Sequence, residues 1–476
     1  MNFPEHTVEK IGGTSMSRAR ELVDTLFIGD RKDVYNRIFV VSAFGGITNL
    51  LLEDKKTGEP GVYGLFASGD QSHAWLDKLT EVANAMREAH RALLDHPGDL
   101  KEADDFVRDR IEGARSCLLD LQRLCSYGHF RLSEHMRIIR ELLSGLGEAH
   151  SALSSALMLR RAGVEARTID LSGWRDEREM SLKERIESGL QDADPSREIL
   201  IVTGYAQCRE GLMKEYDRGY SEVTFSRIAA MTGAREAIIH KEFHLSSADP
   251  KLVGMENVRK LGHTNYDVAD QLSNMGMEAI HPKAARTLRQ AQVPLRVTNA
   301  FEPKDPGTLI DDQPTDTPAA EIVCGLDIYA LDLFEQDMLG VKGYDSTILE
   351  ILRRHNVNIV SKTSNANTIT HFLDASFKAI RRVERDLIET YPNADVSVRA
   401  LSLASVIGRD LSGLGVLGRG MNALDEKGIE VVAAQQPPRL VDVQFIVPRD
   451  QLDDTICTMH DLFFGKASKA VEKKAA

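Results

Sequence analysis

The chain lacks any run of 18 consecutive apolar residues, and its first ten residues, MNFPEHTVEK, lack the apolar core of an export signal. A helix needs about 20 mainly apolar residues to cross a bilayer, and a signal peptide needs an apolar core after a basic start. We therefore expect a protein that is neither inserted into a membrane nor exported, and that works in the cytoplasm.

Cysteine is scarce and scattered. The 476 residues include five cysteines, an odd number, and no two of them have the spacing of a zinc knuckle. Disulfide-stabilised secreted domains and zinc sites both use closely organised cysteine sets. We therefore expect buried free thiols in a reducing compartment and no protein-bound metal; the five residues are Cys117, Cys125, Cys208, Cys324 and Cys457.

Positive charge is also in deficit. Lysine and arginine number 59, aspartate and glutamate number 72, and the formal net charge is -13. A protein that binds nucleic acid needs a clustered basic surface to face the phosphates. The deficit argues against a nucleic-acid partner. It still allows a phosphorylated small substrate, which needs only one local lysine or arginine.

Strand-like and helix-like segments alternate through the first 300 residues. The apolar runs in RIFVVSAFGG (37–46) and EILIVTGYA (198–206) suit strands that are buried on both faces. Helix-like stretches lie at about 71–146 and at 147–163, where Gly163 is the expected stop. Alternation of this kind predicts an α/β layer fold with a mainly parallel sheet.

The composition shifts at a stretch rich in proline and acidic residues, 304–321, which predicts a linker. Beyond it, two rounds of strand, helix, strand, strand, helix form an internal repeat of roughly 65–75 residues. Small βαββα units of this kind bind ligands or dimerise. The predicted parts are a first domain at 1–303, a linker at 304–323, repeat modules at 324–398 and 399–466, and a disordered tail at 467–476.

Two predicted strands end in paired glycines followed by a threonine, in KIGGTS (10–15) and in SAFGGITN (42–49). Glycines let backbone N–H groups approach an anion, and Lys10 adds a positive charge suited to phosphate. Parallel strands end at one edge of a sheet, so both loops would face one crevice. The alternative is a pair of tight turns, because neither loop is a P-loop or a GxGxxG motif.

Charge is concentrated in YDRGYSEVTFSR (216–227). Ser221 can cap a helix that runs to about Thr232, which places Glu222 near the positive end of that helix. Capping leaves Arg218 unexplained. An arginine is disfavoured beside a helix N-terminus unless it meets a carboxylate or a phosphate.

Three more charged residues admit two interpretations each. Glu148 precedes an apolar stretch, where it is either an acid in the first turn of a helix or a counter-charge for a substrate ammonium group. Lys251 and Lys283 follow turns anchored by proline, and each either points to solvent or reaches the crevice.

The order of these pieces resembles the aspartate kinases of the amino acid kinase superfamily. The resemblance covers nearly the whole chain apart from about 55–130, and it includes two C-terminal ACT-like repeats. The pairing of KIGGTSMSR with RGYSEV also resembles the divergent aspartate kinases associated with ectoine biosynthesis. The motifs that carry the resemblance are KIGGTS, VVSAFGGITNLL, GLGEAHSA, VTGY, RGYSEVTF, SSADP, AIHPKAA and VPLRVTNAFEPKDPGTLI.

The resemblance implies a three-layer α/β sandwich like that of carbamate kinase, with two ferredoxin-like ACT domains after it. It implies transfer of the γ-phosphoryl group of MgATP to the β-carboxylate of L-aspartate, the first step of aspartate-family and ectoine biosynthesis. The Mg²⁺ would arrive with the nucleotide. A homodimer or a larger homo-oligomer, and an amino-acid effector at the repeats, are also implied.

The site residues implied by the resemblance are carried over by position. Phosphoryl transfer depends on positioning and charge neutralisation, and aspartate needs no general base because its carboxylate is ionised near pH 7. The implied catalytic residues are Lys10 and Glu222. The implied aspartate-binding residues are Thr48, Glu148, Arg218 and Ser221. The implied nucleotide-binding residues are Lys10, Gly12, Gly13, His240, Lys241, Ser246 and Lys251.

The sequence departs from the family pattern around the expected site. Tyr220 stands where the family has the second glycine of Arg-Gly-Gly-Ser-Asp, and Glu222 stands for its aspartate. The nucleotide segment, usually Thr-Asp-Val-x-Gly, reads HKEFH at 240–244, and Glu278 replaces a lysine. Lys241 or Lys283 is the candidate to supply the missing positive charge.

The repeats also depart from the family. The Thr-Ser-Glu effector signature reads Thr363-Ser364-Asn365, and Pro437-Pro438-Arg439 stands where a Ser-Glu pair is typical. The missing acids would meet the ammonium group of an inhibitor, so we predict weak or absent feedback by lysine.

Two alternatives to an aspartate kinase remain at this stage. One is a kinase for another amino acid on the same fold. The other is a non-catalytic sensor that binds amino acids through its repeats, which the altered nucleotide segment favours. The survival of Lys10, Thr48, Glu148, Arg218 and Ser221 favours the kinase.

Overall fold

A computed structural model describes residues 3–54, 57–69, 73–215, 219–277, 279–315 and 317–465. The chain divides into two compact units. The first comprises 1–244 with 280–312, and the second comprises 245–279 with 313–476. Among the described residues, no helix combines the length and the apolar character that crossing a membrane requires.

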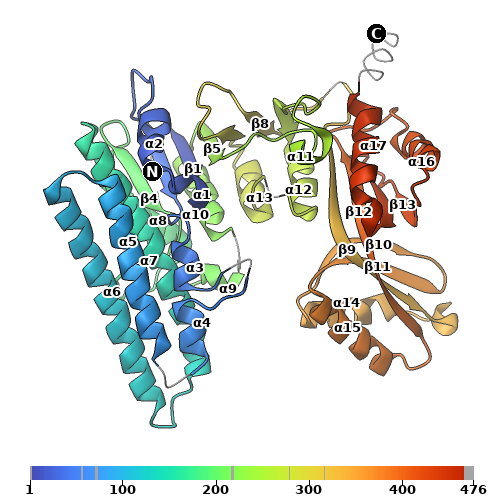
Figure 1. The fold of residues 1–476 in the computed structure, drawn as a ribbon, viewed down its shortest axis with the longest axis horizontal. Helices are drawn as coiled ribbons and strands as arrows, with labels where there is room; N and C mark the ends of the chain where they lie inside the picture. Colours follow the sequence, from blue (N-terminus) through green and yellow to red (C-terminus); the bar gives the residue numbers. More distant parts are fainter. Residues whose placement is uncertain are drawn as a thin grey trace. The chain divides into compact units, whose positions relative to one another are not determined.

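The first unit is built on a mainly parallel sheet with the strand order β3-β4-β2-β1-β5-β7-β8 (Figure 1). Every pair is parallel except β7 with β8. The central strands are buried along their whole length, as their continuous apolar sequences predict. The strands are β1 (Thr7–Ile11), β2 (Arg37–Val41), β3 (Ala166–Ile169), β4 (Ile199–Thr203), β5 (Glu236–Lys241), β7 (Leu295–Asn299) and β8 (Thr308–Asp311).

Helices surround this sheet, and three long ones dominate the N-terminal part of the unit (Figure 1). These three pack with the sheet into one apolar core. A π-helical turn covers Val23–Phe27. The helices are α1 (Gly13–Met16), α2 (Ala19–Leu22), α3 (Ile47–Leu51), α4 (Val62–Ala67), α5 (Ala74–Leu93), α6 (Pro97–Cys125), α7 (Leu132–Arg161), α8 (Leu182–Gly189), α9 (Leu212–Glu215), α10 (Tyr220–Thr232) and α13 (Pro282–Gln290).

Two helix starts differ from the sequence prediction. The helix that carries Glu148 begins at Leu132, so Glu148 lies in its middle and is not a first-turn acid. The prediction that Ser221 caps α10 is also wrong, because Gly219 is the N-cap residue, with φ +78°. Glycine adopts this left-handed conformation without the steric cost of a Cβ atom.

The second unit is built on an antiparallel sheet with the strand order β10-β11-β9-β12-β14-β13. The two long strands β9 and β12 pair along 13 residues each and join the two repeats into one sheet. The strands of this sheet are β9 (Ile322–Phe334), β10 (Asn358–Ser364), β11 (Thr368–Asp374), β12 (Asp395–Ile407), β13 (Ala433–Gln435) and β14 (Asp442–Pro448); the short strand β6 (His263–Asn265) of the same unit is not part of it.

Helices of each repeat form a separate core against this sheet (Figure 1). The helix α12 contributes Val268 and Leu272 to a further core with β9 and β12, which explains why the segment 245–279 belongs to this unit. The helices are α11 (Pro250–Val253), α12 (Tyr266–Asn274), α14 (Tyr344–Arg354), α15 (Phe377–Thr390), α16 (Val416–Glu426) and α17 (Leu452–Phe464), with 3-10 turns at Gln336–Met338 and Arg449–Gln451.

The described elements cross the boundaries proposed from composition. Strand β8 lies inside the stretch assigned to a linker, and β9 begins in it. Strand β12 runs through the boundary drawn at 398 and 399. Composition marked the proline-rich stretch correctly as a change of region but gave no signal for strand pairing. The predicted tail, 467–476, lies outside the described residues.

All five cysteines are free thiols, as predicted, but they are not all buried. Cys208 and Cys324 are buried, and burial raises the pKa of each thiol to about 12. Cys117 is exposed on α6.

Candidate active site

Three loops converge at one edge of the first unit's sheet, after β1, β2 and β4. These strands are parallel, so their carboxyl ends share that edge. A Cβ atom added to Gly13 would lie 3.0 Å from the carbonyl oxygen of Ala43, and one added to Gly204 would lie 2.5 Å from the Cβ atom of Ser221. Gly12 faces open space. The glycines therefore allow the close approach of loops that the paired-glycine motifs predicted.

Lys10 and Glu222 form an ion pair at this edge. The distance from Lys10 Nζ to Glu222 Oε1 is 3.0 Å, and the two side chains are only 11% and 12% exposed. The other carboxylate oxygen, Oε2, accepts a hydrogen bond of 2.5 Å from the backbone N–H of His281. The two residues expected to be catalytic are thus in contact, although 212 positions separate them in the chain.

The surroundings of Glu222 keep it ionised. Burial opposes its charge, but Lys10, Lys241 and the hydrogen bond from His281 outweigh burial and lower the pKa of Glu222. The Glu222 carboxylate thus pairs with Lys10 and also feels the positive charge of Lys241. Two ammonium groups near one edge of a sheet are a charge pattern that suits a polyphosphate.

Glu148 lies at the same edge, on α7, and is 2% exposed. Its Oε2 accepts a hydrogen bond from the backbone N–H of Tyr205. A Cβ atom on Gly204 would come within 3.1 Å of that oxygen, so only glycine leaves room for the carboxylate there. Gly147 also permits a close contact, because a Cβ atom added to it would lie 2.9 Å from the Cβ atom of Ala43. The helix α7 is thereby packed directly on the loop after β2.

Tyr220 fills the place of the family's second glycine beside Glu148. Burial raises the pKa of the Tyr220 phenol well above its usual value, and the Glu148 charge and a hydrogen bond to its carboxylate add to the effect. The Tyr220 ring contacts the ring of Tyr205 edge-on, with centroids 5.9 Å apart. The substitution therefore adds a hydroxyl that binds the carboxylate expected to hold substrate.

Ser221 and Thr48 lie on the neighbouring loops. Ser221 Oγ is 3.5 Å from Ser42 Oγ, at the end of β2, and Ser221 also contacts the place of Gly204. Thr48 is partly exposed on α3. Arg218, the predicted clamp for the α-carboxylate, lies outside the described residues, as does Glu278.

Alternation along β1 and β5 sends Glu9 and His240 to the opposite face of the sheet from Lys10 and Lys241. Glu9 binds Arg37 through two hydrogen bonds, of 2.6 and 2.9 Å, and His240 Nε2 at 2.7 Å. Burial opposes the Glu9 charge, but Arg37 and His240 hold its pKa well below the usual value.

His240 has no nitrogen left for a nucleotide in this arrangement. Its Nδ1 lies 2.8 Å from Thr298 Oγ1, while Nε2 binds Glu9. Strand alternation thus separates two neighbours of the HKEFH segment: the His240 side chain joins the network of Glu9 and Arg37, and Lys241 helps to lower the pKa of Glu222. Ser246 and Lys251, also expected to bind nucleotide, belong to the second unit.

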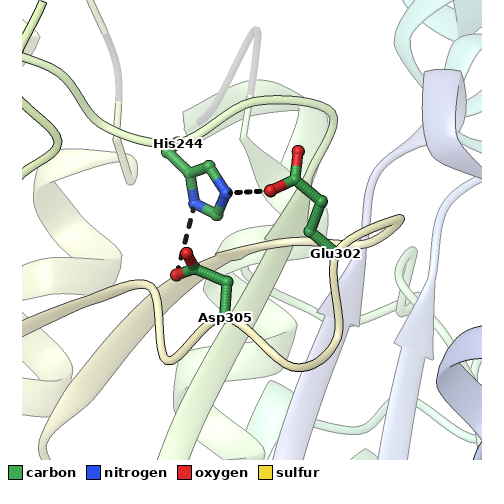
Figure 2. A group of neighbouring side chains, drawn as sticks. All are labelled: His244, Glu302 and Asp305. Atoms are coloured by element: carbon green, nitrogen blue, oxygen red, sulfur yellow. Dashed lines mark hydrogen bonds and ion pairs between the residues drawn. The ribbon is translucent and has the colours of Figure 1, made fainter.

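His244, at the end of the same segment, lies between two carboxylates (Figure 2). Its Nε2 is 3.0 Å from Glu302 Oε2, and its Nδ1 is 3.8 Å from Asp305 Oδ1. The three residues could each offer a metal ligand, within 4.8 Å of one another. The two nitrogens, however, face different carboxylates, so the ring itself bridges the two acids. Mg²⁺ prefers oxygen ligands, so the ion of MgATP does not match this cluster.

The structure adds functional candidates that sequence reasoning missed. Gly204, Tyr205 and His281 lie in motifs that carry the family resemblance, VTGY and AIHPKAA, but none of the three was assigned a role from the sequence. The Tyr and Gly of VTGY lie directly after a buried strand at the predicted edge. That position was the available signal.

Comparison with known proteins agrees with this architecture. The sequence profile described as the Amino acid kinase family matches residues 5–299. The chain is 51% identical over 459 residues to Aspartate kinase Ask_Ect of Stutzerimonas stutzeri (strain A1501), with 96% of each chain covered. It is 23% identical over 489 residues to Lysine-sensitive aspartokinase 3 of Escherichia coli (strain K12), covering 97% of this chain and 99% of that protein.

Solved structures share the fold. Escherichia coli aspartokinase III in complex with aspartate and ADP has a TM-score of 0.70 at 20% identity, covering 97% of this chain and 100% of that one. The same enzyme in complex with lysine and aspartate gives a TM-score of 0.71 at 20% identity, with the same coverage. The predicted fold class, a mainly parallel α/β domain followed by ACT-like repeats, is confirmed.

Proposed function

The chain belongs to the amino acid kinase family, and from this starting point we propose that it is an aspartate kinase. It transfers the γ-phosphoryl group of MgATP to the β-carboxylate of L-aspartate and releases ADP and 4-phospho-L-aspartate. The observation that carries the proposal is that Lys10, Glu222 and Glu148 lie together at one edge of the sheet. The high identity to a relative named as an aspartate kinase over nearly the whole chain supports this substrate.

The proposed division of labour follows from charge. Lys10, with Gly12 and Gly13 beside it and Lys241 nearby, meets the phosphates of ATP, because ammonium groups neutralise the charge on the transferred group. Glu222 holds Lys10 in place through its carboxylate and is itself stabilised by the charge of Lys241. Mg²⁺ enters as part of the nucleotide substrate. Ser246 and Lys251 remain proposed nucleotide contacts, whereas the His240 side chain is no longer among them.

Aspartate occupies the other half of the edge in this proposal. The buried Glu148 carboxylate accepts the α-ammonium group, and Thr48 and Ser221 supply hydroxyl groups. Arg218 binds the α-carboxylate in a forked pair, a geometry that arginine matches. A β-carboxylate oxygen then attacks the γ-phosphorus atom, and the electrons of the broken P–O bond leave with ADP.

We also propose that lysine inhibits the enzyme weakly or not at all. Asn365 stands where the repeats of the family carry an acid, and its side-chain oxygen accepts hydrogen bonds from the backbone N–H groups of Asn367 and Thr368. Its side chain thus closes the turn between β10 and β11. The enzyme would work in the cytoplasm, where ATP is available, as a homodimer or a larger homo-oligomer, and ectoine synthesis is the proposed destination of its product.

An acceptor assay tests the proposal. The protein is incubated with MgATP and hydroxylamine, and aspartate, glutamate or acetylglutamate is offered in parallel. We expect acyl hydroxamate with aspartate, undiminished by millimolar lysine. If none of the three acceptors gives product, the result would favour the non-catalytic sensor. Product with glutamate alone would favour a kinase of another amino acid.

A further inference from the structure

A cavity lies in the first unit, lined by Tyr205 but not by Glu148. Its volume is about 480 Å³, within the range of about 300–1,000 Å³ typical of small-molecule sites. It is enclosed by α6, by α7 and by the loops that follow β3 and β4. None of Ser42, Thr48, Glu148 and Ser221 lines it. The α6 wall comes from a part of the chain that contains none of the motifs quoted for the family resemblance.

Close packing shapes one wall of this cavity. The indole ring of Trp174 rests on α6 at Gly113, where an added Cβ would lie 2.5 Å from the ring atom Cζ2. The Arg110 guanidinium lies over the same indole, 4.7 Å from its centroid, and binds Asp170 and Ser172. These contacts hold Trp174 as an aromatic wall, with its indole N–H donated to Asp109 at 3.1 Å.

Two charged residues of α7 line the opposite side. Glu141 Oε1 is buried and meets no donor in good hydrogen-bond geometry among the described residues, while Oε2 accepts a hydrogen bond of 3.1 Å from the Tyr205 hydroxyl and the backbone N–H of Met213 also favours the charged carboxylate. Arg137, one turn earlier, is exposed and acts electrostatically on Glu141. In the described part of the chain, no carboxylate lies within ion-pair distance of Arg137. A buried acceptor without a partner is costly unless a donor satisfies it.

We propose that this cavity binds a free α-amino acid with an apolar side chain. The ammonium group of the ligand donates to Glu141 Oε1, its carboxylate meets the Arg137 guanidinium, and its side chain packs against Trp174. A zwitterion matches an acceptor and a guanidinium placed one helical turn apart, and aromatic and apolar lining residues suit an apolar side chain.

Tyr205 links the cavity to the proposed aspartate site. Its hydroxyl binds Glu141, and its backbone N–H binds Glu148. A ligand whose ammonium group attracts Glu141 therefore also affects Tyr205, the residue that orients Glu148. This coupling rests on the proposed function, whereas binding to the cavity does not.

Tryptophan fluorescence can detect the binding directly, because the chain contains only Trp75 and Trp174. Trp75, on α5, is buried against Phe66 of α4 and does not line the cavity, so its fluorescence acts as an internal reference. L-alanine, L-leucine and L-phenylalanine are titrated into the full-length protein up to about 10 mM, where an affinity near 1 mM would saturate. We expect a saturable change for L-leucine or L-phenylalanine that is absent from Trp174→Phe.

Charge requirements are tested with probes and variants. L-leucinamide lacks the carboxylate and 4-methylpentanoate lacks the ammonium group, and each should bind at least about tenfold more weakly than L-leucine. Glu141→Gln and Arg137→Ala should weaken L-leucine binding to a similar extent. The matched controls are Glu134→Gln on α7 and Arg123→Ala on α6, two exposed residues outside the cavity lining, which should not change it.

Several results would overturn the proposal. No saturable change with any of the three amino acids, or binding that both Glu141→Gln and Arg137→Ala leave intact, would contradict the site. Calorimetry on the same variants detects any binding that leaves the tryptophan fluorescence unchanged. If the site holds, saturating L-leucine should change the KM for aspartate, and an unchanged KM would contradict the link through Tyr205. An enzyme inactive with every acceptor would refute the proposed function, while the binding data would still decide the cavity.

Discussion

The two faces of strands β1 and β5 use charge in opposite ways. On one face, Glu9, Arg37 and His240 are buried and satisfy one another, and Thr298 accepts or donates at the remaining histidine nitrogen. On the other face, Lys10 pairs with the carboxylate of Glu222, and Lys241 adds a second positive charge that acts on the same carboxylate. One cluster is complete without a ligand, and the other gathers positive charge that phosphate can use. The difference teaches that alternation along a strand separates structural charges from functional ones at adjacent positions.

The largest effect is expected on the face that carries Glu9, Arg37 and His240, and it is a loss of folding stability. Glu9→Gln leaves the Arg37 guanidinium buried without a counter-charge, and we expect the free energy of unfolding to fall by about 3–5 kcal/mol. Denaturant titration measures the loss. Glu21→Gln removes an exposed ion pair with Arg18 and should cost at most about 1 kcal/mol. A loss for Glu9→Gln no larger than that of its control would contradict the structural role.

On the functional face, the expected loss is in catalysis. Lys10→Met should lower kcat by about 10²–10³-fold, because a charge aimed at the transferred phosphoryl group is removed. The unfolding midpoint should change little, since Lys241 and the His281 N–H still face Glu222. The exposed Lys183→Met is the control and should keep full activity. Retained kcat in Lys10→Met would place the phosphate contact elsewhere.

A neutral buried pair behind the site provides a pH test. His150 Nε2 lies 2.8 Å from His90 Nε2, and burial lowers the pKa of His150 to about 3. The unfolded chain protonates this histidine below about pH 6.5, but the folded chain does not. The stabilisation is therefore complete above that pH and is lost by about 1.4 kcal/mol per pH unit as the pH falls toward 3.

The matching variant isolates this contribution. His150→Gln should flatten the dependence of the unfolding free energy on pH between about 5 and 7, compared with the unchanged protein. Parallel slopes in the two proteins would mean that His150 is protonated in the folded state as well.

The smallest effect is expected at the substituted glycine position. Tyr220→Phe removes the hydroxyl that binds the Glu148 carboxylate but leaves the hydrogen bond from the Tyr205 backbone N–H, so only part of what orients Glu148 is lost. We expect the KM for aspartate to rise by roughly two- to tenfold with the KM for MgATP unchanged. An equal change in both constants would show that Tyr220 supports the loop as a whole and not the aspartate site.

The sequence predicted the features that depend on interactions between neighbouring residues. Continuous apolar runs identified β2 and β4, and the paired glycines placed the loop edge, because both signals arise from neighbouring residues. The pairing of Lys10 with Glu222 came from family resemblance, since no local rule links positions 212 apart. The start of α7 at Leu132 was missed because Gly145 and Gly147 interrupt the helical pattern. Both glycines are required by close packing against Tyr205 and Ala43.

Composition could not assign the segment HKEFH. Strand alternation decides which of its side chains reaches the site, and that decision needs the register of β5 against β1. The same applies to 245–279, whose membership in the second unit depends on packing of α12 against distant strands.

The most direct test of the division between the two faces compares His240 with Lys241, adjacent residues on one strand. The KM for MgATP is measured for His240→Gln and Lys241→Met after both variants are confirmed to be folded at the assay temperature. We predict a rise of about tenfold for Lys241→Met, the equivalent of one weakened charge-assisted contact, and no change for His240→Gln. A larger rise for His240→Gln than for Lys241→Met would contradict the account.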